Sequence, residues 1–252
     1  MELDRIYNMD CLEGMKQILD KSIDMILCDL PYGQTTRNRW DAIIKFEHLW
    51  LHYSRIIKDN GAIVLFANGM FTADLMYSNR AWWRYNLIWD KVLVSGFLNA
   101  NKMPMRQHED ICVFYKKPPT YNPQKTIGEK KNHSKGNFTP QDDHGGYNYG
   151  KANAVDNAET LGTLKHPTSI IRISKPHPSV SIHPTQKPVE LCEWIIRTYT
   201  NECQTVLDNC MGSGTTAIAA INTNRNYIGF ELDKTYYDLS LKRIAEHTKR
   251  GD

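Results

Sequence analysis

A carboxylate, a proline and an aromatic ring follow an apolar run in the stretch D-L-P-Y-G, which begins at Asp29. Residues 23–28 are typical of a buried strand, so Asp29 should stand at the carboxyl end of that strand. Asp29 and the Leu30 carbonyl could accept both hydrogens of an exocyclic amino group and direct its lone pair toward an electrophile. Pro31 would fix the turn, and the ring face of Tyr32, rather than its hydroxyl, could stack an extruded base. An isolated D-x-P-Y is more often a structural turn with a packing tyrosine.

A second candidate is the glycine turn D-N-C-M-G-S-G-T-T, which begins at Asp208 and leads from a strand into a helix. Gly212 and Gly214 allow a tight turn and a close approach of a ligand to the backbone. No Gly-Lys-Ser/Thr follows, which excludes a Walker A loop, and Ala217 stands where G-x-G-x-x-G has its third glycine. Glu231 ends the next strand about twenty residues later, where a carboxylate can hold ribose hydroxyls. The turn could be a plain helix cap and Glu231 a surface acid. Together, however, the two features favour a site for a nucleoside-containing cofactor.

Alternating apolar runs and amphipathic stretches predict an α/β fold, with a parallel sheet covered by helices. The predicted strands are residues 5–8, 23–28, 62–66, 85–89, 111–115, 205–207 and 227–230, and the predicted helices are 11–19, 46–57, 189–199, 215–222 and 234–247. Four of these strands are followed by an acid, namely Asp10, Asp29, Asp208 and Glu231. Open α/β sheets bind ligands at the carboxyl ends of their strands, so four such acids outline a polar cleft.

Composition is that of an ordinary globular protein, with 41% hydrophobic and 23% charged residues in 252. No apolar run could span a bilayer, and the N-terminus lacks the pattern of a signal peptide, so we expect a cytoplasmic protein. The six cysteines include no C-x-x-C pair, which favours reduced core thiols, and the histidines lack ligand spacing, so we expect no metal.

Residues 116–182 differ from the rest of the chain, because they are poor in aliphatic residues and carry ten Lys or Arg against five Asp or Glu. The chain has a net charge of +3, so the remainder is near −2. So long a stretch without periodicity indicates a functional or disordered insertion. Its charge is equally compatible with a polyanion partner and with a solvated loop.

Three motifs together resemble those of the β class of amino-group DNA methyltransferases. D-L-P-Y-G looks like the D-P-P-Y motif of that family, and the glycine turn is similar to its S-adenosylmethionine loop, D-P-F-x-G-S-G-T-T. H-P-T-Q-K-P, residues 183–188, resembles the segment that precedes this loop. The catalytic motif comes before the cofactor loop, with the insertion between them, which is the β-class order. The motif sequences D-L-P-Y-G and Q-K-P are most similar to those of adenine-specific enzymes of bacteria and their phages. The protein would therefore act in a bacterial cell, or in the host cell if a phage encodes it.

The resemblance implies a Rossmann-like methyltransferase sheet with a circularly permuted strand order, in which residues 5–8 form the family's third strand. Residues 1–115 would be the catalytic half, 116–182 a target-recognition insertion, and 183–252 the cofactor-binding half. The implied catalytic residues are Asp29, Leu30, Pro31 and Tyr32. The implied cofactor residues are Asp10 and Cys11 near the adenine, Glu231 on the ribose, and Asp208, Gly212, Ser213, Gly214, Thr215, Thr185 and Lys187 around the methionine half. Lys187 would pair with the cofactor's carboxylate. Leu30 departs from the family's first proline, and Asn209 and Cys210 replace Pro-Phe, so a cofactor-packing aromatic is missing.

The implied reaction is methylation of N6 of adenine in double-stranded DNA. N4 of cytosine is an alternative, although the family's cytosine enzymes more often carry serine at position 29. A more remote alternative is a non-catalytic DNA-binding protein, which would be expected to have lost these motifs. Candidate DNA contacts are Arg37, Arg39 and Trp40 in the loop after the catalytic motif, and Lys130, Lys131 and Lys135 in the insertion; residues 97–109 would line the base pocket. A homodimer and a restriction endonuclease partner are expectations from the family alone, and no membrane partner is expected.

Overall fold

The computed structural model describes residues 1–33, 43–129, 163–176, 182 and 185–251, which fall into two compact units. The first unit combines Met1–Asn122 with Ser169–Asp252. The second, Pro123–Thr168, contains a small antiparallel pair of β6 (Thr126–Ile127) with β7 (Leu164–Lys165). The second unit is therefore narrower than the predicted insertion of 116–182, because both flanks of that segment belong to the first unit.

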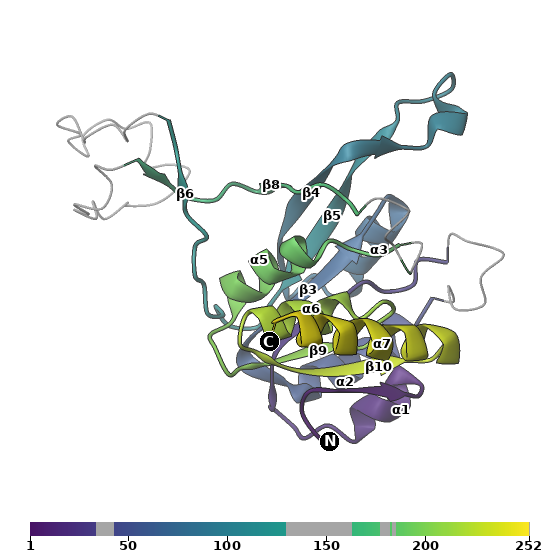
Figure 1. Cartoon of the computed structure of the whole chain (residues 1–252), viewed down its shortest axis with the longest axis vertical. Coiled ribbons are helices and arrows are strands. Elements are labelled where there is room, and N and C mark those ends of the chain that lie inside the picture. Colours follow the sequence, from purple (N-terminus) through teal and green to yellow (C-terminus); the bar gives the residue numbers. More distant parts are fainter. Residues whose placement is uncertain (34–42, 130–162, 177–181, 183–184, 252) are drawn as a thin grey trace. The chain divides into compact units, whose positions relative to one another are not determined.

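The first unit is built on an eight-stranded sheet with the order β1-β10-β9-β2-β3-β5-β4-β8 (Figure 1). Its strands are β1 (Arg5–Asn8), β2 (Ile23–Cys28), β3 (Ile57–Ala67), β4 (Trp83–Ser95), β5 (Arg106–Phe114), β8 (Ile170–Arg172), β9 (Thr205–Asp208) and β10 (Asn226–Glu231). The first strand of the chain pairs in parallel with the last, which confirms the permuted order. The prediction of an all-parallel sheet is wrong for β5, which is antiparallel to both of its neighbours. A direct hairpin joins β4 to β5, and only antiparallel strands can be joined in that way.

Helices cover both faces of this sheet. They are α1 (Cys11–Lys16), α2 (Phe46–Ile56), α3 (Met70–Ser78), α5 (Val189–Tyr199), α6 (Thr215–Asn222) and α7 (Lys234–Gly251), with a short 3₁₀ helix, η1 (Phe97–Asn99), in the β4–β5 hairpin. Helix α3 was not predicted, because its apolar residues do not mark one face: Phe71 and Leu75 are buried while Met70 and Tyr77 are exposed. Among the described residues, no helix is long and apolar enough to cross a bilayer.

Successive side chains of each strand point to opposite faces of the sheet, so the sheet separates two hydrophobic cores. In β2, Met25 and Leu27 pack on the face covered by α5 and α6, whereas Ile26 and Cys28 pack on the face covered by α1, α2 and α3. Helix α7 adds Tyr237 to the first of these cores. Since β1, β10, β9 and β2 are parallel neighbours, their carboxyl ends lie along one edge between the two helical layers.

Candidate active site

A cavity of about 760 Å³ opens at the carboxyl ends of the parallel strands. Cavities of about 300–1,000 Å³ commonly bind cofactors and other small molecules. Its lining includes residues from all three sequence motifs: Asp29, Leu30, Pro31 and Tyr32; Asp208, Gly212, Ser213 and Thr215; and Thr185 and Lys187. Asp10, Cys11 and Glu231 also line it. The structure therefore brings together segments that are up to about 200 residues apart in the sequence.

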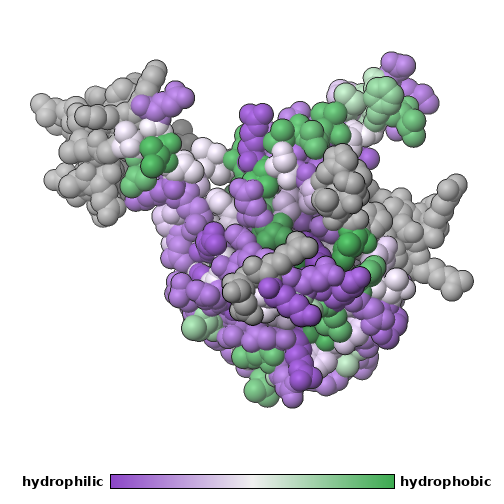
Figure 2. Space-filling view, viewed as in Figure 1, coloured by the Kyte–Doolittle hydropathy of each residue, from purple (hydrophilic) through white to green (hydrophobic). Residues whose placement is uncertain are grey.

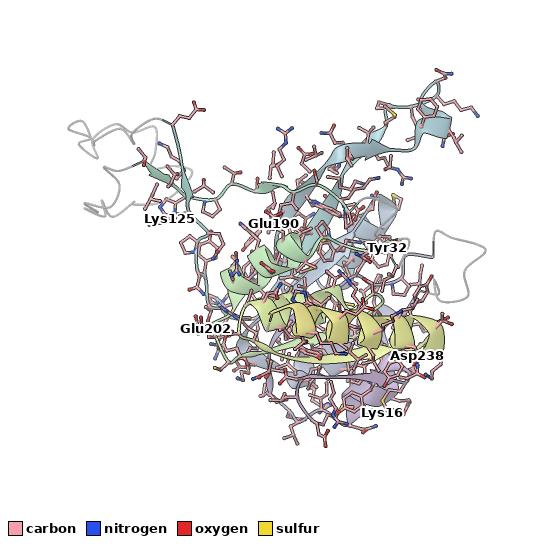
Figure 3. All side chains as sticks on the ribbon, in the orientation of Figure 1. Lys16, Tyr32, Lys125, Glu190, Glu202 and Asp238 are labelled. Carbon is pink, nitrogen blue, oxygen red and sulfur yellow. The ribbon has the colours of Figure 1, made fainter. Side chains whose placement is uncertain are left out.

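Asp29 lies between a tyrosine and a lysine. Its Oδ1 accepts a hydrogen bond of 2.6 Å from the Tyr32 hydroxyl, and its Oδ2 accepts one from Lys187 Nζ. Burial raises the pKa of Asp29, and the Lys187 ammonium opposes that rise. Burial and the Asp29 charge both raise the pKa of Tyr32, which keeps its hydroxyl protonated as a donor. The hydroxyl of Tyr32 thus contacts Asp29, and its ring packs against Phe71 with the ring centroids 4.7 Å apart. The stacking role of the ring stays a prediction. Figure 3 shows Tyr32 well apart from Lys16 of α1 and Asp238 of α7.

A chain of four alternating charges extends from Asp29 into the protein. Lys187 Nζ also lies 3.5 Å from Glu109 Oε2, and Lys91 Nζ lies 3.2 Å from Glu109 Oε1. The side chains of Lys187 and Lys91 are only 9% and 7% exposed. Burial would lower the pKa of Lys187, but Asp29 and Glu109 outweigh it and the pKa is raised. Burial would raise the pKa of Glu109, but Lys187 and Lys91 hold it below its usual value. Lys187 and Glu109 thus stabilise each other in their charged forms.

Sequence reasoning missed Lys91 as a member of this site. It placed Glu109 only at the end of the expected pocket stretch 97–109, of which Arg106 and Glu109 line the cavity. Lys91 and Glu109 belong to the paired strands β4 and β5, where Trp89 stands opposite Glu109. A signal was present for Lys91, because it is a charged residue within a strand that is otherwise rich in apolar residues. The Lys187 ammonium faces two protein carboxylates, and its pairing with the cofactor's carboxylate stays a prediction.

The glycine turn is held by contacts from two directions. Its Gly212 amide donates to Glu231 Oε2 at 2.7 Å, with Gly212 at a φ of +52°. Arg243 of α7 donates from Nη1 to the Ser213 carbonyl and to Thr215 Oγ1, both at 2.9 Å. No sequence motif points to this arginine, which lies 30 residues from Ser213 along the chain.

Gly214 does not line the cavity, contrary to the contact that the resemblance implied. It is the N-cap of α6 with a φ of +75°, a left-handed conformation that favours glycine. An added Cβ would also lie 3.2 Å from Ser240 Cβ. Its role is therefore in the backbone of the turn.

The remaining acids each have a local structural role, and so does Asn209, which stands where the family has proline. Asp10 caps α1, accepting from the Leu12 amide at 2.8 Å. Asp208 accepts from the Cys210 amide at 3.0 Å, and burial raises the pKa of Asp208 to about 6. Asn209 accepts a hydrogen bond of 2.5 Å from the buried hydroxyl of Tyr53, which ties the turn to α2.

The six candidate DNA contacts cannot be placed in this site. Arg37, Arg39, Trp40, Lys130, Lys131 and Lys135 all lie outside the described residues.

The strand order, the glycine turn and the cavity at the strand ends are together those of a methyltransferase-type α/β fold, and solved structures share it. PvuII DNA methyltransferase (cytosine-N4-specific) has a TM-score of 0.65 at 16% identity, over 97% of this chain and 91% of its own. The M1.HpyAVI–SAM complex has a TM-score of 0.60 at 24% identity, over 95% of this chain and 98% of its own.

The chain belongs to the N6/N4 DNA methylase family, whose model matches residues 23–242. The type II methyltransferase M2.MboI of Moraxella bovis is 30% identical, over 96% of this chain and 88% of the relative. The type II methyltransferase M.BglII of Bacillus subtilis is 28% identical, over 96% of this chain and 69% of the relative. The resemblance drawn from the three motifs is therefore confirmed, and the protein is an enzyme that methylates DNA.

Proposed function

We propose that the protein transfers a methyl group from S-adenosylmethionine to N6 of adenine within one sequence of double-stranded DNA. The observation that carries this proposal is the position of Asp29, which lines the same cavity as the glycine turn. Asp29 and the Leu30 carbonyl would accept the two hydrogens of the target amino group, and Tyr32 would support the extruded base. Because two acceptors localise the nitrogen lone pair, the amino group can attack without first losing a proton.

The residues around the cavity fit S-adenosylmethionine. The glycine turn allows a close approach to its backbone, while Glu231 at the end of β10 and Asp10 after β1 suit hydroxyl and amino groups of a nucleoside. When bound, this cofactor supplies an electrophilic methyl group. The hydroxyls of Ser213 and Thr215 and the Thr185 side chain would hold its polar methionine end.

N4 of cytosine is the second candidate, because one structural relative is named as cytosine-N4-specific. The same two acceptors serve either amino group. Aspartate at position 29 favours adenine, following the family resemblance. Single-molecule sequencing of DNA from a methylation-free host expressing the protein tests both, with Asp29→Ala as the negative control. N6-methyladenine at one sequence is the expected result; N4-methylcytosine would correct the base, and unmodified DNA would overturn the activity.

We further propose that the enzyme acts in the cytoplasm, as a homodimer, beside a restriction endonuclease. The type II names of the relatives support the endonuclease partner. DNA methylated by this enzyme should then resist the endonuclease that cuts the sequence found by single-molecule sequencing.

Residues 116–182 are proposed to select the target sequence, and their lysines to contact phosphates. Replacing Lys130, Lys131 and Lys135 by alanine should weaken binding to all DNA sequences alike. The slope of log affinity against log salt should flatten by about 2.7, because each lost phosphate contact removes about 0.9 counterion. Fluorescence anisotropy across a salt series measures this slope. An unchanged slope would mean that these lysines do not touch the DNA backbone.

Arg243→Met should weaken binding of S-adenosylmethionine about tenfold. Its hydrogen bonds to Ser213 and Thr215 fix the turn that would contact the cofactor, and bonds from a charged donor contribute about 1.5–3 kcal/mol. Isothermal titration with the cofactor measures the change. Lys242→Met is the matched control, because Lys242 is 73% exposed and pairs only loosely with Glu246. Equal affinities in both variants would show that α7 does not hold the turn.

A further inference from the structure

An asparagine follows strand β3, at the same edge of the sheet as the catalytic motif. Asn68 is half-buried and lines the cavity. Strands β2 and β3 are parallel with Cys28 opposite Leu65, so the same register brings Asn68 beside Pro31. Within the described part of the chain, the Asn68 side chain has no hydrogen-bond partner. Its carboxamide is therefore available to a ligand in the cavity.

The residue beside Asn68 on the next strand is an acceptor without a donor. Strands β3 and β5 are antiparallel, and their regular pairing ends with Ala67 opposite Asp110. The next pair in that register is Asn68 with Glu109, and the Cβ atoms of such a pair lie about 4.5–5.5 Å apart on one face. Among the described residues, Glu109 Oε2 is the one buried side-chain oxygen or nitrogen without a hydrogen bond, although Lys187 Nζ lies 3.5 Å from it. A buried acceptor of this kind calls for an explanation in a native structure.

The turn that carries Asn68 is held at both of its ends. Before the turn, Ala67 is paired with β5, and after it the Thr72 hydroxyl of α3 donates to Asp110 Oδ2 at 2.8 Å. Gly69 has a φ of +59°, although an added Cβ would meet no atom within 4 Å. Glycine is therefore required there by the backbone conformation and not by space. The position of Asn68 is thus set by the sheet and by the start of α3.

The row of side chains continues onto β4 with an aromatic ring. Trp89 stands opposite Glu109 and also lines the cavity, and its Nε1 donates to the Ile173 carbonyl at 2.8 Å. One pair further on, regular pairing ends at Asp90 opposite His108. Beyond it the hairpin extends away from the body of the sheet (Figure 1), and apolar side chains gather at its end (Figure 2). The amide, the carboxylate and the indole therefore belong to the sheet, where an amide beside an aromatic ring suits the edge of an extruded base.

We propose that Asn68 recognises the extruded base by donating a hydrogen bond to the ring nitrogen next to its amino group. That nitrogen is N1 in adenine and N3 in cytosine, and both are acceptors. With the amino group held at Asp29, the ring nitrogen beside it lies within reach of the neighbouring strand, which supplies Asn68. This inference rests on the proposed role of Asp29, and it holds for either base.

Glu109 explains why the amide would donate rather than accept. A carboxylate attracts the N–H end of an amide and repels its carbonyl end, and the amide nitrogen has two hydrogens. One hydrogen of Asn68 would go to Glu109 Oε2 and the other to the base, so the unpaired acceptor would gain its donor when the base enters. Thymine and guanine carry an N–H at the corresponding ring position. They would set a donor against a donor and be disfavoured.

Removing the contact from either side tests this proposal. Asn68→Ala should slow single-turnover methyl transfer about tenfold on DNA with the normal target base, because the ring nitrogen loses its donor. In 1-deazaadenine, or in 3-deazacytosine if the mapped base is cytosine, a C–H replaces that nitrogen. On DNA with the deaza base, Asn68→Ala and the unaltered protein should differ by less than about twofold, because the variant has no contact left to lose. Isothermal titration should show the same affinity for S-adenosylmethionine in both proteins.

Asn101→Ala is the matched control, since Asn101 is exposed in the β4–β5 hairpin and does not line the cavity. It should match the unaltered protein on both DNAs. Equal slowing of Asn68→Ala on the two DNAs would overturn the proposal, because the residue would then act on the fold or the cofactor. A full rate of Asn68→Ala on the normal base would overturn it as well. Absence of transfer by the unaltered protein to any DNA would refute the proposed function itself, and this inference with it.

Discussion

Replacing Asp29 by alanine is expected to lower methyl transfer at least about 10³-fold, because proton acceptors of this kind contribute about 10²–10⁴-fold and Asp29 also orients the amino group. Affinity for S-adenosylmethionine should stay within about threefold, since Asp29 is assigned to the target base. Isothermal titration with the cofactor and a tritium-transfer assay on DNA measure the two quantities. Appreciable turnover in the folded variant would refute the assignment.

The variant needs a control for stability, because the buried Lys187 ammonium loses one of its two carboxylate partners and keeps only Glu109, at 3.5 Å. Breaking a buried ion pair costs about 3–5 kcal/mol, and less here because the Asp29 side chain is 22% exposed. The double variant Asp29→Ala/Lys187→Met also removes this weakly paired ammonium. It should unfold at a higher temperature than Asp29→Ala and should be equally inactive. An inactive but fully folded double variant assigns the loss to chemistry rather than to unfolding.

The parts of the fold that could be predicted are those with a local signal. The strand before Asp29 is an unbroken apolar run, and the strand before the glycine turn ends at a turn signal. The acids of the cavity could be anticipated because each directly follows or ends such a strand. Even the cap of α1 had a signal, since Asp10 stands three residues before Glu13, as in a capping box.

The rest depends on contacts between distant residues. Lys187 meets Asp29 across 158 positions, and nothing near Lys187 in the sequence indicates that its ammonium is buried. The direction of β5 follows from a hairpin whose turn has none of the usual short-loop signals. Arg243 is one of several charged residues on α7, and only the packing of that helix selects it for the glycine turn. For the same reason the catalytic motif was predicted and the chain of charges behind it was not.

Replacing Lys187 by methionine should lower methyl transfer at neutral pH by about 10²-fold and move the acidic limb of the pH–rate profile to higher pH. Asp29 must be ionised to accept its hydrogen of the amino group beside the Leu30 carbonyl, so activity rises as the pH passes the pKa of Asp29. Burial raises that pKa, and the Lys187 ammonium lowers it. Without the ammonium, burial and the nearby Glu109 charge both raise the pKa, so Asp29 holds its proton up to a higher pH. Raising the pH should therefore restore part of the activity.

Single-turnover rates from about pH 5 to about pH 10, with S-adenosylmethionine saturating, measure the shift. Lys91→Met is the matched control, because Lys91 is equally buried and contacts Glu109 but not Asp29. Lys91→Met should also move the acidic limb to higher pH, but by a smaller amount, because the loss of Lys91 leaves the charge of Glu109 less neutralised. The sequence-based expectation for Lys187 predicts a different result. If its ammonium pairs with the carboxylate of the cofactor, Lys187→Met should raise the Kd for S-adenosylmethionine and leave the acidic limb unmoved. The pH profile thus decides whether this lysine serves the base or the cofactor.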